Sequence, residues 1–246
     1  MIDVLSCYNI NFIHKFWVGL MDGDGSLQVN HWRKQSLQFR LIIKLKFLES
    51  NENMLNILCS FLGGHVRYIF KQKVKCFVIW VVNDKTLFIK ILRIFDVYKP
   101  LTSRLLCQLE FAKKCLQLPM NDIKWYFENR NLKYKEHNNQ SFKQPFYFDV
   151  WLVGFIEAEG CFCTRNLSSK NISFSIGQNN DYYLLLAIKN YFNGVNKIIK
   201  RTNNFFVWEV YNKSVLLNIV NHCSDVQHPL LGAKMDSLKL FIKFLN

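Results

Sequence analysis

The most constraining feature of this sequence is a nine-residue block that occurs twice. Residues 17–25 read WVGLMDGDG, and residues 152–160 read LVGFIEAEG. The offset between matching positions is constant, because 154 − 19 = 135 and 159 − 24 = 135. A chain with such a repeat is expected to fold into two similar halves that bury a shared core.

The similarity continues on the C-terminal side of each block. Residues 38–45 and 173–177 both read as strands, and residues 61–64 and 191–194 both close a helical stretch with glycine. Segments 66–82 and 195–211 read as second hairpins. PLTSR at 100–104 and PLLGAK at 229–234 each precede an amphipathic helix.

These patterns predict an α+β protein with two pseudo-symmetric αββαββα repeats and antiparallel sheets. The N-terminal half is assigned to residues 1–117, a polar connector to 118–146 and the C-terminal half to 147–246. Alternation along 38–46 predicts a strand with one apolar face and one basic outer face.

The repeated blocks predict a pair of helices in direct contact, at Phe12–Gly23 and Phe148–Ala158. Gly19 and Gly154 lie on helix faces whose small residues are four apart, which allows close backbone approach. Packed in parallel about a pseudo-twofold axis, the helices would end together. Two helix C-termini and two carboxylates would then require a cation, and oxygen ligands of this kind suit Mg²⁺.

Both blocks resemble the LAGLIDADG motif of homing endonucleases, in the single-chain form with two motifs. The resemblance extends from about Asn11 to Leu245. It implies that the last acid of each motif, Asp24 and Glu159, binds metal and is catalytic. It also implies that the preceding residues, Gly23 and Ala158, supply backbone carbonyl ligands. The earlier acids, Asp22 and Glu157, are interpreted as supporting the helix pair or capping neighbouring backbone.

The resemblance also implies auxiliary catalytic residues. A polar residue near the metal ions at the end of the second strand matches Gln178, whereas the first half departs from this pattern with Ile43. A basic residue after the Pro-Leu turn matches Lys234, with Arg104 as its nearest counterpart. Since arginine keeps its proton at neutral pH, Arg104 is expected to act as a fixed charge.

In this family the two sheets form a saddle over the duplex, because a twisted β-ribbon fits the major groove. The residues expected to contact DNA in the first half are Gln28, Asn30, Trp32, Lys34, Gln38, Arg40, Lys44, Arg67, Lys71, Lys73 and Lys75. Those expected in the second half are Arg165, Ser173, Ser175, Lys200 and Arg201. Because the halves differ, the preferred site should be long and asymmetric.

Charge and composition agree with a nucleic-acid partner. The formal net charge is +14, and such an excess attracts polyanions. No apolar run reaches membrane-spanning length, and the start of the chain does not read as a secretory signal. The eight cysteines contain no Cys-x-x-Cys pair, which argues against a zinc site.

The sequence therefore predicts a Mg²⁺-dependent endonuclease for double-stranded DNA that acts as a monomer, with Mn²⁺ or Ca²⁺ able to substitute in binding. The alternative from another class is a maturase that binds its host intron RNA, with or without cleavage. A silent DNA-binding regulator on the same fold is a third possibility. Richness in Phe, Asn, Lys and Ile, together with family habit, favours a mitochondrial or other organellar origin.

Overall fold

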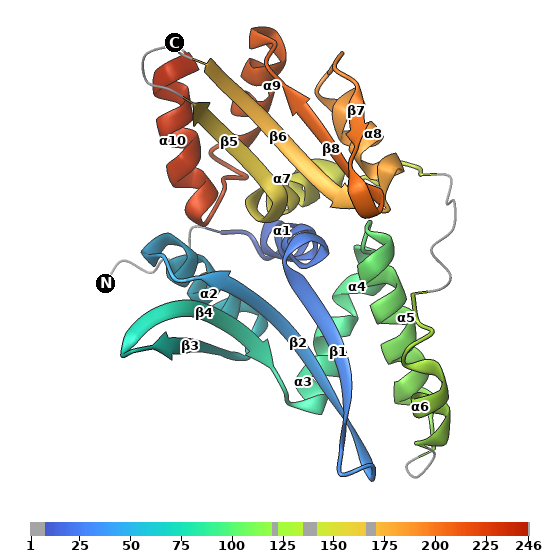
Figure 1. Cartoon of the computed structure of the whole chain (residues 1–246). Helices are drawn as coiled ribbons and strands as arrows, with labels where there is room; N and C mark the ends of the chain where they lie inside the picture. The colour runs from blue at the N-terminus through green and yellow to red at the C-terminus, as the bar shows by residue number, and fades with distance from the viewer. Residues whose placement is uncertain (1–7, 120–122, 135–141, 166–170, 246) are drawn as a thin grey trace.

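A computed structural model of the chain describes residues 8–119, 123–134, 142–165 and 171–245 (Figure 1). Two helices with nearly fully buried faces, α1 (Ile10–Gly23) and α7 (Phe148–Glu159), lie side by side at its centre. One sheet lies on each side of this pair (Figure 1). The predicted pseudo-symmetric α+β arrangement is confirmed.

Each half repeats the same order of elements. The first half continues with β1 (Gly25–Trp32), β2 (Ser36–Lys46), α2 (Glu49–Leu62), β3 (His65–Lys71), β4 (Val74–Val82), α3 (Lys85–Leu92), α4 (Ile94–Val97) and α5 (Ser103–Gln117). The second continues with β5 (Gly160–Arg165), β6 (Asn171–Asn179), α8 (Tyr182–Tyr191), β7 (Ile198–Lys200), a 3₁₀ turn (Thr202–Asn204), β8 (Phe205–Val210), α9 (Lys213–Cys223) and α10 (Ala233–Leu245).

Both sheets are antiparallel and have the same topology, β1-β2-β4-β3 and β5-β6-β8-β7. The hairpins predicted at 66–82 and 195–211 are confirmed. The first-half hairpins turn at Arg33, Lys34 and Gln72, which have the positive φ that tight hairpins need. In β2 the residues from Gln38 to Lys46 alternate as predicted, so that one face packs on helices and the other is open.

The structure adds helices that the sequence pattern did not indicate. Each half contains a helical segment before its last helix, α3 with α4 in one and α9 in the other. Asp84 and Asn212 cap α3 and α9 through their side-chain oxygens. The connector, expected to be a polar loop, contains the short helix α6 (Lys124–Asn129).

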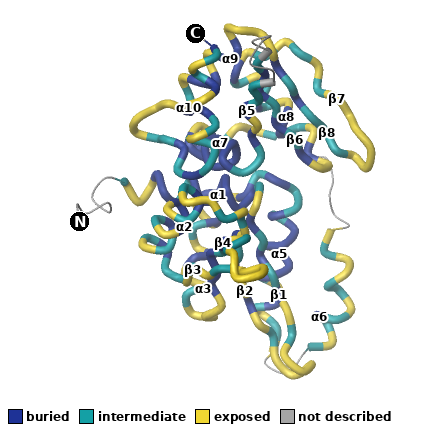
Figure 2. Tube along the Cα trace, turned by 60° about the vertical axis from the view of Figure 1, so that its left-hand side comes forward, coloured by how far each residue is buried: buried dark blue, intermediate teal, exposed yellow. Residues whose placement is uncertain are grey.

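The buried core is continuous across both halves. Trp17, Trp80, Trp151 and Trp208 are completely buried and belong to this core. Figure 2 shows α1 and α7 as buried tubes at the centre, with exposed residues at the hairpin tips. None of the helices in the described part of the chain has the length and apolar character needed to cross a membrane.

Candidate active site

The backbones of α1 and α7 are in direct contact. A Cβ on Gly19 would overlap the carbonyl oxygen of Trp151, and a Cβ on Gly154 would overlap that of Phe16. Only glycine fits at both positions, since the clashing atoms belong to the backbone and cannot rotate away. The close approach predicted from the small residues is therefore confirmed.

This contact brings the last acids of the two motifs together. Asp24 caps the C-terminal end of α1, and Glu159 is the last residue of α7. A Cβ on Gly23 would lie 3.1 Å from Cγ of Glu159, so the acid of one helix lies against the end of the other. Two negative helix ends and two carboxylates thus share one small region, as the sequence predicted.

Both carboxyl groups are difficult to ionise in this environment. Burial raises the pKa of Asp24 to about 6, opposed by the positive charges of Lys234 and Arg104. Burial, followed by the negative charge of Asp24, raises the pKa of Glu159 to about 7. Burial contributes more to the raised pKa of Glu159 than the repulsion between the two carboxylates. A bound cation would remove the cost of ionising the pair.

The raised pKa values predict how metal-free stability depends on pH. Because the folded pKa of Glu159 lies above its ordinary value of 4.5, its contribution to stability is full below that value. The contribution is lost as pH rises towards about 7. We expect Glu159→Gln to reduce the fall in unfolding free energy between about pH 5 and pH 7.5, measured by denaturant titration in EDTA. Parallel pH profiles of the wild-type and variant proteins would contradict this assignment.

Arg104, the second residue of α5, clamps the C-terminal end of α1. Its Nη2 donates to the carbonyl oxygens of Met21, Asp22 and Gly23 at 3.1, 2.7 and 3.0 Å, and its Nη1 donates to Gly25 at 2.6 Å. The guanidinium therefore neutralises the negative helix end beside Glu159. The carbonyl oxygen of Gly23, which is also the predicted metal ligand, is one of these acceptors.

The inner acids of the motifs position the two basic residues. Asp22 is completely buried and accepts from the backbone nitrogens of Leu101 and Thr102 at the start of α5. Glu157 accepts from the backbone nitrogens of Gly232 and Lys234, each at 3.0 Å, at the start of α10. Their interpretation as capping groups is confirmed.

Each of these helix starts is also held by the opposite half. Asp181, before α8, accepts from the nitrogen of Ser103 at 3.0 Å, and Asn51, in α2, accepts from the nitrogen of Ala233 at 3.0 Å. Trp151 of α7 also donates its Nε1 hydrogen to Asp22 at 2.7 Å. The basic residues are therefore placed by hydrogen bonds from both halves.

We expect Glu157→Ala to lower the unfolding free energy by about 2 kcal/mol, because it leaves buried backbone donors without an acceptor. Glu157→Gln keeps one acceptor oxygen and should lose less. Thermal or denaturant unfolding measures both, with the exposed Glu110→Ala of α5 as the control. Equal stability of Glu157→Ala and Glu110→Ala would contradict the capping role.

A cavity of about 510 Å³ opens beside the acid pair. Glu159 and Gln178 line it together with Gly23 and Arg104. Gln178 is buried at the end of β6, where its Oε1 accepts from the nitrogen of Asn179 at 3.2 Å. Lys234 is not among the residues that line this cavity, although its charge acts on both Asp24 and Glu159. Arg104 and Lys234 therefore lie on different sides of the helix pair.

Comparison with known proteins identifies the family. The sequence profile described as LAGLIDADG endonuclease matches residues 17–115 and again residues 152–245. The chain belongs to the LAGLIDADG endonuclease family. It is 43% identical to a "Probable intron-encoded endonuclease" of Dictyostelium citrinum, over 94% of this chain and 95% of that protein. A relative of that same name from Debaryomyces hansenii is also 43% identical, but this chain spans only 38% of its length.

Solved structures share the fold at low sequence identity. The LAGLIDADG homing endonuclease I-LtrWI, bound to target DNA, superposes with a TM-score of 0.73 at 17% identity, over 96% of this chain and 90% of that one. I-SmaMI, bound to an uncleaved DNA target in the presence of calcium ions, gives a TM-score of 0.67 at 18% identity, over 94% and 90%.

Most of the basic and amide side chains predicted for the first LAGLIDADG half lie on the open sheet face. Gln28 pairs with Arg40 and Asn30 pairs with Gln38 across β1 and β2, so their side chains share this face. The others on this face or at the exposed hairpin tips are Trp32, Lys34, Lys44, Arg67, Lys71 and Lys73.

Lys75 is a correction to the predicted DNA face. The register shifts between Ile69 and Phe70, which leaves Cys76 as an extra residue and moves Lys75 to the helix side of the sheet. There its Nζ lies 3.5 Å from Oε1 of Glu52 and 4.0 Å from the ring centroid of Tyr68. Simple alternation along β4 could not reveal this bulge.

The second half requires further corrections. Lys200 pairs with Phe206, whose ring contacts Tyr182 of α8, so Lys200 lies on the helix side of the sheet edge. Ser173 is on the open face but is buried, and its hydroxyl donates to Glu209 at 3.2 Å.

The other second-half positions are less constrained. Ser175 is half-buried on the open face, and Arg201 is exposed. Arg165 ends β5, and its side chain lies outside the described residues.

The structure also brings residues to the open faces that the sequence reading omitted. Ser26 lies two residues before Gln28 in β1, and Cys161 and Cys163 lie four and two residues before Arg165 in β5. Cys161 is exposed and Cys163 is half-buried. Extending the strand alternation back to the motif would have found all three.

Proposed function

We propose that this chain is a site-specific endonuclease that hydrolyses phosphodiesters on both strands of a long, asymmetric DNA site with the aid of divalent metal ions. The observation that carries the proposal is the meeting of Asp24 and Glu159 at the ends of twin helices, between two sheets with open polar faces. Family membership and the names of the relatives support the same activity.

The donor set fits a hard divalent cation such as Mg²⁺, with Mn²⁺ or Ca²⁺ substituting in binding. Asp24 and Glu159 are buried acids with raised pKa, and a cation would relieve both burial and repulsion. Among the described residues no cluster of three or more His, Cys, Asp or Glu side chains could hold a metal. Further ligands would be the carbonyls of Gly23 and Ala158, phosphate oxygens and water. When bound, the metal would activate water and stabilise the leaving oxygen.

The protein's own residues supply charge and position. Arg104 and Lys234 would offset negative charge as it develops at the phosphates, one on each side of the helix pair. Gln178, in the cavity wall, would orient water or a phosphate oxygen through its amide. The Gly23 carbonyl oxygen has two lone pairs, so it can bind the metal while it accepts from Arg104.

The open sheet faces would read the base edges in the major groove. Asn and Gln side chains match adenine edges, whereas Arg and Lys match guanine or phosphates. We propose this role for the outward positions that the structure leaves open, and no longer for Lys75, Lys200 or Ser173. Two halves at 1–117 and 147–246, joined by the connector 118–146, would give a monomer that binds without a partner copy.

The names of the relatives support a proposal about the origin of the chain. The relatives from Dictyostelium citrinum and Debaryomyces hansenii are both named intron-encoded. We propose that this chain is encoded by a mobile intron in a mitochondrial genome.

Incubation with DNA that carries the joined exons of the host gene tests the activity. We expect cleavage of both strands with Mg²⁺ and intact DNA with EDTA. Binding without cleavage under both conditions would indicate a DNA-binding regulator. Binding of intron RNA with no DNA cleavage would favour the maturase. The names of the relatives favour the endonuclease.

We expect the two strands to be nicked at unequal rates. Arg104 presents a planar guanidinium that four backbone carbonyls hold, whereas Lys234 presents a compact ammonium on a four-carbon stem. A supercoiled plasmid with one site reports this as a transient nicked form before linear product. Equal first-order rates on an end-labelled duplex would contradict the predicted inequality.

A further inference from the structure

The connector contributes a residue to the cavity beside the acid pair. Tyr134, five residues after the end of α6, lines the same cavity as Arg104, Glu159 and Gln178. Neither repeated half contains this residue, because the connector occurs once. Tyr134 is 39% exposed although it lies against α5.

The Tyr134 hydroxyl is held in place by a buried glutamine. Gln108 of α5 donates its Nε2 hydrogen to the Tyr134 oxygen at 2.9 Å, and its own Oε1 accepts from the nitrogen of Leu27 at 2.8 Å. Gln108 lies one helical turn after Arg104, which binds the Gly25 carbonyl on the same strand edge. The unpaired edge of β1 therefore anchors both the guanidinium and the tyrosine.

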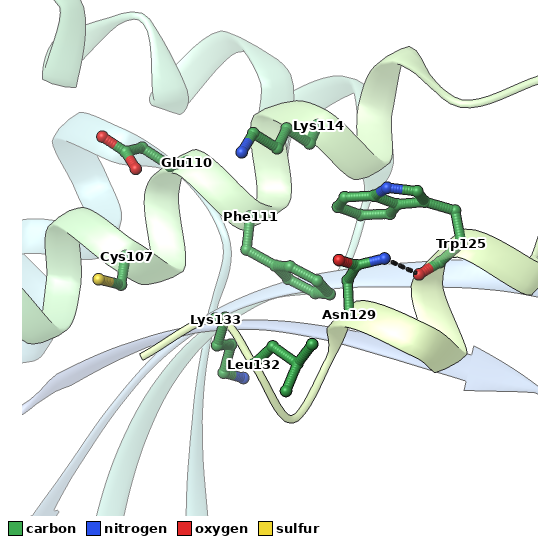
Figure 3. Close-up of a pocket in the computed structure, with 8 residues that line it drawn as sticks. All are labelled: Cys107, Glu110, Phe111, Lys114, Trp125, Asn129, Leu132 and Lys133. Carbon is green, nitrogen blue, oxygen red and sulfur yellow. Dashed lines mark hydrogen bonds between the residues drawn. The ribbon is translucent and has the colours of Figure 1, made fainter. Parts of the chain in front are cut away.

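Aromatic packing fixes the connector against α5. Figure 3 shows the second cavity, of about 250 Å³, in which Trp125 of α6 lies over Phe111 of α5. Their ring centroids are 5.7 Å apart and the rings are stacked. Lys133, next to Tyr134, places its Nζ 5.6 Å from the Phe111 ring centroid. Tyr134 is thus presented by a docked segment.

Within the described residues, the start of α10 on the other side of the helix pair has no equivalent group. Lys234 takes the place of Arg104 as the second residue of α10, and the residue one turn later is the buried Leu238 instead of Gln108. An apolar side chain at this position cannot hold a hydroxyl. The two halves therefore differ both in the basic residue itself and in the side chain that lies one turn after it.

We propose that the Tyr134 hydroxyl binds the scissile phosphate at the cleavage centre formed by Arg104, Glu159 and Gln178, and that Gln108 is its positioning residue. Gln108 donates to the phenol oxygen, so the phenol keeps its own hydrogen, which a non-bridging phosphate oxygen in the cavity would accept. The proposal rests on the proposed nuclease function and assigns this donor to one strand only.

Tyr134→Phe removes this donor together with the oxygen that accepts from Gln108. We expect it to slow cleavage of one strand about tenfold, the cost of one hydrogen bond of about 1.4 kcal/mol, and to leave the other strand within about twofold. Gln178→Ala should slow the same strand, whereas Lys234→Met should act mainly on the other. Single-turnover rates on a duplex labelled separately at each strand measure all three.

Tyr126→Phe is the matched control. Tyr126 belongs to the same connector and donates its hydroxyl to the carbonyl of Val29 at 3.0 Å, also on the β1 edge, but it does not line the cavity of Tyr134. Tyr126→Phe should change only the unfolding free energy. The ratio of the cleavage rates on the two DNA strands should stay unchanged. Full-speed cleavage of both strands by Tyr134→Phe would overturn the proposal, as would equal slowing of both. The proposed nuclease function fails separately, if the wild-type protein with Mg²⁺ cuts neither strand.

Discussion

Asp24→Asn is expected to abolish cleavage while leaving DNA binding nearly intact. The asparagine keeps the shape of the side chain at the end of α1 but removes the charge that would hold the metal. Loss of metal-assisted activation should slow cleavage by more than about 1,000-fold, or about 4 kcal/mol in the barrier. The sheet faces that read DNA are unchanged, so affinity by fluorescence anisotropy should change less than about threefold.

Asp96→Asn serves as the control for this substitution. Asp96 pairs with Lys113 on the surface, and its side chain is 56% exposed, so the same chemical change occurs far from the proposed chemistry. Single-turnover assays near pH 8 keep the wild-type carboxylates ionised, since the pKa of Asp24 is about 6 and that of Glu159 about 7 because of burial. Normal cleavage by Asp24→Asn would show that the metal role assigned to this acid is wrong.

The central helix pair could be predicted from the sequence because its requirements are local and repeated. Only glycine allows the backbone contact at Gly19 and Gly154, and the acids follow at a constant offset. The strand alternation along β2 was equally informative, because one of its faces is buried and the other open. A period of two residues shows which side chains share a face of a strand, and a spacing of four residues shows which share a face of a helix.

What the sequence did not predict depends on long-range partners. No local pattern shows that Arg104 reaches back to the carbonyls at the end of α1, or that Asp181 and Asn51 hold helices of the opposite half. The bulge at Cys76 depends on pairing between β3 and β4 and reverses the side on which Lys75 lies. Tyr134 was read as part of a polar loop, and only the folded connector brings it to the acid pair.

Gly154→Ala is expected to destabilise the protein strongly, although alanine favours an isolated helix by about 0.5–1 kcal/mol over glycine. The added methyl would overlap the Phe16 carbonyl oxygen and lie 3.0 Å from the Leu20 nitrogen. Since both atoms are backbone, α1 and α7 must separate, at a cost of roughly 3 kcal/mol or more in unfolding free energy. Chemical denaturation measures this loss.

Separation of the helices also connects stability to catalysis. The same movement would pull Asp24 away from Glu159, and a misplacement of about 1 Å can reduce a catalytic rate about 100-fold. Folded Gly154→Ala protein at low temperature should therefore cleave slowly even where it is fully native by circular dichroism. Asn56→Ala, at an exposed position of α2, is the control and should be neutral or slightly stabilising. If Gly154→Ala were as stable and as active as Asn56→Ala, the backbone contact would be wrong, and the shared metal site that depends on it would lose its support.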